Sequence, residues 1–189
     1  MEARRVNQVG VALVLMNFAV VGLLPVLFFR RDGRLNMRWW LTAAPFFATP
    51  LFIIAAEAGF VTPLTHQLAP AAVPLAVLSI ALVAYAAGAH QARIALWHQE
   101  ADAPQQIVTW GPYRWVRHPF YAAFLLALAG AAALCPHPAT LAAWLYALVA
   151  LSLTARREEG RLRASPLGAS YAAHMRVTGR FLPRLRRAQ

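Results

Sequence analysis

The chain has 189 residues, of which 60% are hydrophobic and only 13% are charged, and its formal net charge is +11. A soluble domain carries about a quarter charged residues, so this chain has too few to cover a water-soluble surface, and a lipid bilayer is its expected solvent. The positive charge alone would suit nucleic acid. Most arginines, however, lie in short clusters beside apolar runs, as membrane-flanking charges do, which argues against a nucleic-acid partner.

Five apolar stretches follow one another along the chain, at about residues 9–29, 39–61, 68–90, 120–135 and 140–154. The first three each have about the 20 residues that a helix needs to cross the hydrocarbon core of a bilayer. The last two are shorter, and the proline-rich link between them predicts an antiparallel helical pair. Because neither spans the core alone, flanking residues are expected to extend both helices. The predicted fold is an all-α integral membrane protein with about five transmembrane helices and a C-terminal helical hairpin.

The placement of arginine predicts the orientation of these helices. The link at residues 30–38, the segment at 93–117 and the tail from residue 156 are strongly basic, whereas links 62–67 and 136–138 carry no Lys or Arg. Positive charge marks the cytoplasmic side of a membrane. We therefore expect the C-terminus in the cytoplasm and the N-terminus outside. The high Ala and Arg content favours a prokaryotic inner (plasma) membrane.

Polar residues concentrate in two segments on the predicted cytoplasmic side, one before the fourth helix and one after the fifth. They divide the chain into membrane helices at residues 1–92 and a catalytic or cofactor-binding region at residues 93–189. Since the last two helices form a hairpin, the residues from Arg117 to Tyr121 are expected to face Glu158 and Glu159.

These residues suit a zwitterionic ligand that carries a further positive charge. Pro119 falls in the first turn of the fourth helix, where free backbone N–H groups beside Arg117 favour a carboxylate. Glu158 and Glu159 could hold an ammonium, a sulfonium or ribose hydroxyls, and nearby Tyr and Trp rings offer flat surfaces to a purine or a cation. An amino acid joined to adenosine through a sulfonium combines these features.

Simpler explanations exist for each part of this cluster. Trp110 and Trp115 are typical of membrane-interface anchors, and Glu158 and Glu159 could lie on a solvated helical face. The six histidines show none of the close spacings of a metal site, and Cys135 is the only cysteine, so we expect no metal. Two other functions stay open: a membrane reductase using NADPH on an isoprenoid or sterol-like substrate, and a non-catalytic membrane binding protein.

Two motifs resemble the isoprenylcysteine carboxyl methyltransferase family. Ile107-Val-Thr-Trp-Gly-Pro-Tyr-Arg-Trp-Val-Arg-His-Pro-Phe-Tyr121 is similar to the family signature. The tail is similar to the family's ending, with Glu158-Glu159, then Leu167-Gly168-Ala-Ser-Tyr171, then Gly179-Arg-Phe-Leu-Pro183. The resemblance covers about residues 107–183. It departs where an arginine is expected near Thr154, for which Arg156 and Arg157 are the candidate substitutes.

The resemblance implies S-adenosylmethionine as cofactor and methylation of a lipophilic acceptor that enters from the bilayer. An isoprenylcysteine-like carboxylate and other lipids are open as acceptors. We expect direct in-line displacement helped by positioning and desolvation, with Arg117 and Glu159 as catalytic residues. The cofactor contacts implied are His98, Gln105, Gln106, Ile107, Val108, Tyr113, His118, Pro119, Phe120, Tyr121, Glu158 and Glu159.

Overall fold

The computed structural model describes residues 2–22, 33–65, 67–89 and 107–184. The regular elements in these ranges are helices, as predicted: α1 (Glu2–Gly22), α2 (Met37–Glu57), α3 (Ala69–Gly88), the 3-10 helix η1 (Gly111–Arg114), α4 (Pro119–Leu134), α5 (Pro138–Ala164) and α6 (Gly168–Val177). Proline occupies the first or second position of α3, η1, α4 and α5. Proline suits this place because its fixed φ is helical and its missing N–H has no partner there.

Within the described ranges, three helices are long and apolar enough to cross a membrane: α2, α3 and α5. Two shorter apolar helical segments accompany them, Gln8–Val20 within α1 and Pro119–Leu134, which is α4. Length and composition thus support an integral membrane protein, whereas the count of five transmembrane helices stays a prediction.

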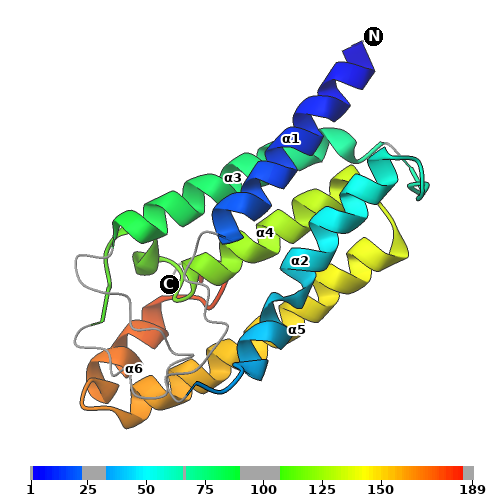
Figure 1. Cartoon of the computed structure of the whole chain (residues 1–189). Helices are drawn as coiled ribbons and strands as arrows, with labels where there is room; N and C mark the ends of the chain where they lie inside the picture. Colours follow the sequence, from blue (N-terminus) through cyan, green and yellow to red (C-terminus); the bar gives the residue numbers. More distant parts are fainter. Residues whose placement is uncertain (1, 23–32, 66, 90–106, 185–189) are drawn as a thin grey trace.

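The α4 helix lies at the centre of the bundle and contacts α1, α2, α3 and α5 (Figure 1). Its closest neighbour is α3, and the two helices meet through small side chains: Ala72, Ala76, Ala123 and Ala131 are fully buried. Small residues let two helices approach closely, which is the usual way in which helices pack in a membrane.

A short link, Cys135 to His137, joins α4 to α5, and the two helices run side by side in opposite directions (Figure 1). The prediction that flanking residues extend both short helices holds for α5, which continues to Ala164. It is wrong for α4, which keeps its 16 residues. Pro119 fixes its start, and Pro136 disfavours helical backbone at the preceding residue.

A buried polar contact connects three of the helices. The Ser79 hydroxyl of α3 lies 2.7 Å from the Ala123 carbonyl oxygen of α4 and 3.1 Å from Asn17 Oδ1 of α1. Asn17 is 1% exposed, and its side-chain nitrogen lies 3.5 Å from the Ala76 carbonyl oxygen. An unpaired amide here would cost free energy, so these contacts explain how the bundle accommodates Asn17.

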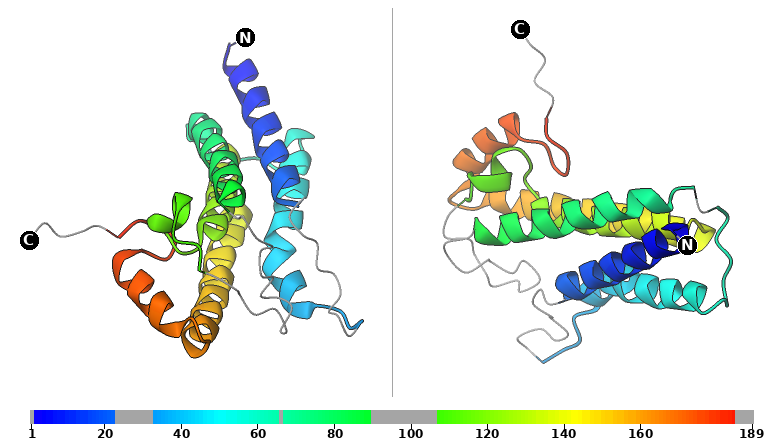
Figure 2. Two further views of the ribbon diagram at one scale, coloured as in Figure 1. Left: turned by 90° about the vertical axis from the view of Figure 1, so that its left-hand side faces the viewer. Right: turned by 90° about the horizontal axis from the view of Figure 1, so that it is seen from above.

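The two ends of the bundle differ in what covers them. At one end α3 ends, α4 begins and α5 ends, and η1, α6 and the C-terminal segment are added there (Figure 2). At the other end the covering is slight: the Leu64 backbone N–H donates to the Pro136 carbonyl oxygen at 2.8 Å. The first end holds the residues that the sequence singled out.

Candidate functional site

The C-terminal strap, residues 178–183, is held against the segment that leads into α4. Val116 and Gly179 form a parallel β-bridge, and the backbone N–H groups of Arg117 and His118 donate to the carbonyl oxygens of Gly179 and Arg180 at 2.9 and 3.1 Å. A side chain at Gly179 would collide with the Leu182 carbonyl oxygen, so the tight turn of the strap requires glycine. This pairing brings Arg180 and Phe181 over the start of α4.

Glu159 lies at the centre of a buried ion-pair cluster. Its Oε1 accepts from Arg117 Nε at 3.0 Å and from Arg180 Nε at 3.1 Å, and its Oε2 accepts from Arg180 Nη2 at 2.6 Å. Only 5% of the Glu159 side chain is exposed. Two guanidinium groups thus compensate the desolvation of this carboxylate, which would be costly to bury alone. The solvated-face explanation is wrong for Glu159.

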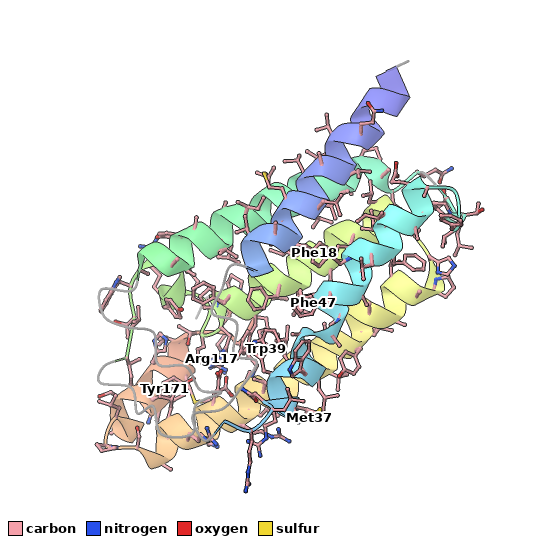
Figure 3. All side chains as sticks on the ribbon, viewed as in Figure 1. Phe18, Met37, Trp39, Phe47, Arg117 and Tyr171 are labelled. Carbon is pink, nitrogen blue, oxygen red and sulfur yellow. The ribbon has the colours of Figure 1, made fainter. Side chains whose placement is uncertain are left out.

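Arg117 joins three parts of the site. Besides its bond to Glu159, its Nη1 donates to the Thr178 carbonyl oxygen of the strap. Figure 3 shows Arg117 and Tyr171 of α6 at the same end of the bundle. The strap, α5 and the start of α4 therefore converge on one guanidinium.

Glu158 has partners of a different kind. Its Oε1 accepts from the Tyr121 hydroxyl at 2.9 Å, and its Oε2 lies 3.2 Å from His118 Nδ1. The Glu158 side chain is 13% exposed. One carboxylate is thus held by two guanidiniums, and its neighbour contacts a phenol and an imidazole.

His118 lies between the two carboxylates. Its Nε2 is 3.4 Å from Glu159 Oε1, and its side chain is 9% exposed. The imidazole stacks parallel to the Tyr121 ring, with centroids 5.2 Å apart, and the Phe181 ring meets it edge-on. Burial opposes a charge on this imidazole, but the neighbouring carboxylates of Glu158 and Glu159 outweigh burial, and the pKa of His118 is raised above its usual value.

Two tyrosines border the cluster from η1 and α6. Burial, followed by the negative charge of Glu158, raises the pKa of Tyr113. Burial and the charge of Glu159 raise the pKa of Tyr171. Both phenols therefore stay protonated over the whole physiological range and can serve as neutral hydrogen-bond donors.

The two tryptophans of the motif pack at the edge of the site. The Trp110 indole N–H donates to the Ala89 carbonyl oxygen at the end of α3, at 2.8 Å. The Arg114 guanidinium lies 3.9 Å from the centre of the Trp115 ring. The Trp110 bond fastens η1 to the end of α3. Both rings keep substantial exposure, as expected of interface residues.

The structure brings together five of the predicted residues: Arg117, His118, Tyr121, Glu158 and Glu159. Pro119 is buried at the first position of α4, and Phe120 packs on the hydrophobic core. Ile107 and Val108 are half-buried in the segment before η1. His98, Gln105 and Gln106 lie outside the described residues.

The suggestion that Arg156 or Arg157 replaces the arginine expected near Thr154 stays a prediction. Arg156 and Arg157, the suggested substitutes near Thr154, are exposed on α5. The guanidinium groups that pair with Glu159 belong to Arg117 and Arg180.

Arg180 is the main residue that the site prediction missed. It lies in the quoted Gly-Arg-Phe-Leu-Pro ending, so the motif contained it, but the basic tail offers many arginines and no spacing that selects one. His174 and Phe181 were missed as well. Burial and then the charge of Arg117 lower the pKa of His174, and Phe181 packs on His118 and Tyr121.

Within the described part of the chain, no three or more His, Cys, Asp or Glu side chains are grouped to hold a metal ion. The ionic chemistry found there is that of guanidinium, imidazole and carboxylate groups.

Comparison with known families gives one match. The sequence model described as "Isoprenylcysteine carboxyl methyltransferase (ICMT) family" matches residues 72–163. This region runs from α3 into the last turns of α5 and contains Arg117, His118, Glu158 and Glu159, whereas the strap lies beyond it. The resemblance that the motifs predicted is confirmed. Comparisons with curated proteins and with solved structures found no match.

Proposed function

We propose that this protein is a membrane methyltransferase that transfers a methyl group from S-adenosylmethionine to a lipophilic acceptor, because residues 72–163 match the sequence model of the isoprenylcysteine carboxyl methyltransferase family. The observation that carries the proposal is the pair of glutamates at the end of α5, beside His118 and Tyr121 at the start of α4. Such a pair of carboxylates can bind a cationic cofactor, and its place at the end of an apolar helical bundle is open to a substrate that approaches through lipid.

The two carboxylates have different roles in this proposal. Glu159 is already neutralised by Arg117 and Arg180, so it positions those two guanidiniums. Glu158, whose contacts are Tyr121 and His118, is the carboxylate that answers a positive or hydroxyl group of the cofactor. The other predicted cofactor contacts, from Ile107 to Phe120, are retained in the proposal as the residues leading into α4.

Positioning accounts for the catalysis proposed here. The cofactor supplies a methyl group on a positively charged sulfur, and an acceptor carboxylate needs no general base to receive it. The protein's own contribution is to hold both partners in line and to exclude water. Arg117, which bonds Glu159 and the Thr178 carbonyl oxygen, stays our candidate for orienting a ligand carboxylate.

The proposed setting is a prokaryotic inner membrane crossed about five times, with the C-terminus in the cytoplasm. The arginines at the described start of α2, the start of α4 and the end of α5 support it, because all belong to the end of the bundle that holds the site. The cofactor then reaches the site from the cytoplasm, and the acceptor reaches it sideways from the bilayer.

A thermal-shift comparison of the detergent-purified protein tests the cofactor class. S-adenosylhomocysteine at about 100 times its Kd should add roughly 2.7 kcal/mol to the free energy of unfolding, whereas NADPH should leave the melting temperature unchanged. Stabilisation by NADPH alone would favour a reductase, and stabilisation by neither would favour a non-catalytic protein. Transfer of a labelled methyl group to a membrane-lipid extract then identifies the acceptor class.

A further inference from the structure

His118 is an imidazole that lies between the two carboxylates of the site. Its Nδ1 faces Glu158 at 3.2 Å and its Nε2 faces Glu159 at 3.4 Å. Glu159 also has two guanidinium partners, so the charge of a protonated His118 mainly balances that of Glu158. The imidazolium is therefore a cation bound inside the protein on the carboxylate that we assign to the cofactor.

We propose that the His118 imidazolium is the counter-ion of Glu158 until the cofactor binds, and that the cofactor's sulfonium then takes its place as His118 loses its proton to solvent. This inference rests on the proposed function. It makes His118 a residue that distinguishes the cofactor from its product. S-adenosylmethionine carries the sulfonium charge, whereas S-adenosylhomocysteine has a neutral thioether and leaves the imidazolium on Glu158.

The surrounding charges favour this exchange. Arg117 and Arg180 reach Glu159 from the start of α4 and from the strap, and Glu158 and Glu159 face His118 from α5. Around them stand Tyr121 of α4, Tyr113 of η1, and Tyr171 and His174 of α6. With His118 protonated, these arginines, glutamates and His118 sum to one net positive charge. A second cation would therefore be repelled unless His118 becomes neutral.

The stacked rings hold His118 in place for either charge state. Tyr121 lies parallel to the imidazole, with 3° between the two planes, and donates its hydroxyl to the same carboxylate. Phe181 covers the imidazole edge-on. Loss of the proton therefore changes the charge at Glu158 and leaves Tyr121 as its hydrogen-bond donor, so Glu158 is not left without a partner.

The test is the proton release that accompanies binding, measured by calorimetry in two buffers of different ionisation enthalpy. Below the raised pKa of His118, S-adenosylmethionine should release about one proton more than S-adenosylhomocysteine does. Its Kd should fall by about tenfold for each unit of rising pH and level off above that pKa, because only the neutral-imidazole form is competent. The Kd of S-adenosylhomocysteine should show no such fall.

Matched variants isolate the contribution of His118. In His118→Asn the asparagine can still donate to Glu158 but does not titrate, so the extra proton release and the pH slope should vanish. His137→Asn changes the histidine of the other His-Pro helix start and should behave as the wild type. The amino groups of the ligands titrate alike in all variants, so the difference between variants reports the protein.

The possible results separate this inference from the proposed function. Binding of both ligands with equal proton release by the wild type overturns the inference, as does an unchanged pH slope in His118→Asn. If His118→Asn fails to fold, Glu158→Gln takes its place, and persistence of the extra proton release there overturns the inference as well. Failure of every folded protein to bind either ligand overturns the proposed function itself.

Discussion

The pair α4–α5 contains the dipeptide His-Pro twice, once at each end of the bundle, and the two copies do different things. Before α5, His137 caps its own helix. Its side-chain Nδ1 accepts from the Ala139 backbone N–H at 3.1 Å, and its backbone N–H donates to the Thr140 hydroxyl in a capping box. Before α4, His118 makes no side-chain cap bond to its own helix. Its imidazole instead faces two carboxylates of α5.

The two copies show that a His-Pro helix start does not by itself determine whether the histidine caps its helix. Thr140, three residues after His137, offers a local partner, and the hydrogen bonds of His137 close within one turn. The residue three after His118 is Tyr121, whose hydroxyl is directed to Glu158. Because His118 has partners on α5, namely Glu158 and Glu159, its side chain belongs to the candidate site and does not cap its own helix.

The largest expected effect concerns the sides of the membrane on which these two ends lie. In a chain with Cys135→Ala, a cysteine at the exposed Ala139 should label from outside intact cells, and one at the exposed Arg163 only after permeabilisation. We place the label at Ala139 because His137 caps α5. Labelling of both cysteines from the same side would contradict the five-helix orientation.

The next effect distinguishes the two glutamates. Glu159→Gln leaves the buried Arg117 and the half-buried Arg180 without their counter-charge. Breaking a buried pair such as Arg117–Glu159 costs about 3–5 kcal/mol. Glu158→Gln should cost less stability and should weaken S-adenosylmethionine binding by about 10- to 100-fold, through loss of a charge-assisted hydrogen bond.

Thermal unfolding and calorimetry on the same two preparations decide between these roles. Glu159→Gln should show the lower melting temperature, and Glu158→Gln the higher Kd. Equal losses of stability in both variants, with unchanged Kd in Glu158→Gln, would return Glu158 to a structural role.

The sequence predicted the meeting of the start of α4 with the end of α5, and the reason is the short link between them. Five apolar segments and a proline-rich connection leave few ways to arrange the last two helices, so Arg117, His118 and Tyr121 had to face Glu158 and Glu159. The strap was beyond such reasoning. Arg180 reaches Glu159 through a β-bridge between Val116 and Gly179, and no local periodicity encodes a pairing over so long a stretch of chain.

The length of α4 was the other feature that sequence reasoning placed wrongly. A helix of 16 residues is about 24 Å long, shorter than the hydrocarbon core of about 30 Å. The prediction of a longer α4 assumes that the helix is surrounded by lipid along its whole length. Most of α4 is buried among its neighbours, so the bundle and not the bilayer sets its length.

A smaller effect is expected for Arg117→Lys, which tests whether this residue orients a ligand or supports Glu159. Lysine keeps the charge but cannot bond both Glu159 and the Thr178 carbonyl oxygen with the geometry of a guanidinium. We expect weaker binding of S-adenosylhomocysteine, by about tenfold for the loss of roughly 1.4 kcal/mol.

Two other results for Arg117→Lys would each revise the site. Retained affinity with a collapse of turnover would place Arg117 on the acceptor, the mark of an interaction made in the transition state. Full activity and affinity would remove Arg117 from the binding site and leave it as a flanking charge.

The smallest expected effect is the pH dependence of stability that His118 gives the protein without any ligand. Its pKa is raised in the folded state, burial notwithstanding, because the carboxylates of Glu158 and Glu159 lie beside its two nitrogens and favour the protonated imidazole. In the unfolded chain its pKa returns to about 6.5. The folded state therefore binds the proton more tightly, and the stability that this proton contributes is fully present below about pH 6.5 and is lost as the pH rises through the folded pKa. The melting temperature of the wild type should fall toward that of His118→Asn over this interval, while His137→Asn should keep a constant offset from the wild type. A wild-type curve parallel to that of His118→Asn at every pH would mean that His118 is neutral between its two carboxylates, and the contrast between the two His-Pro helix starts would then be one of packing alone.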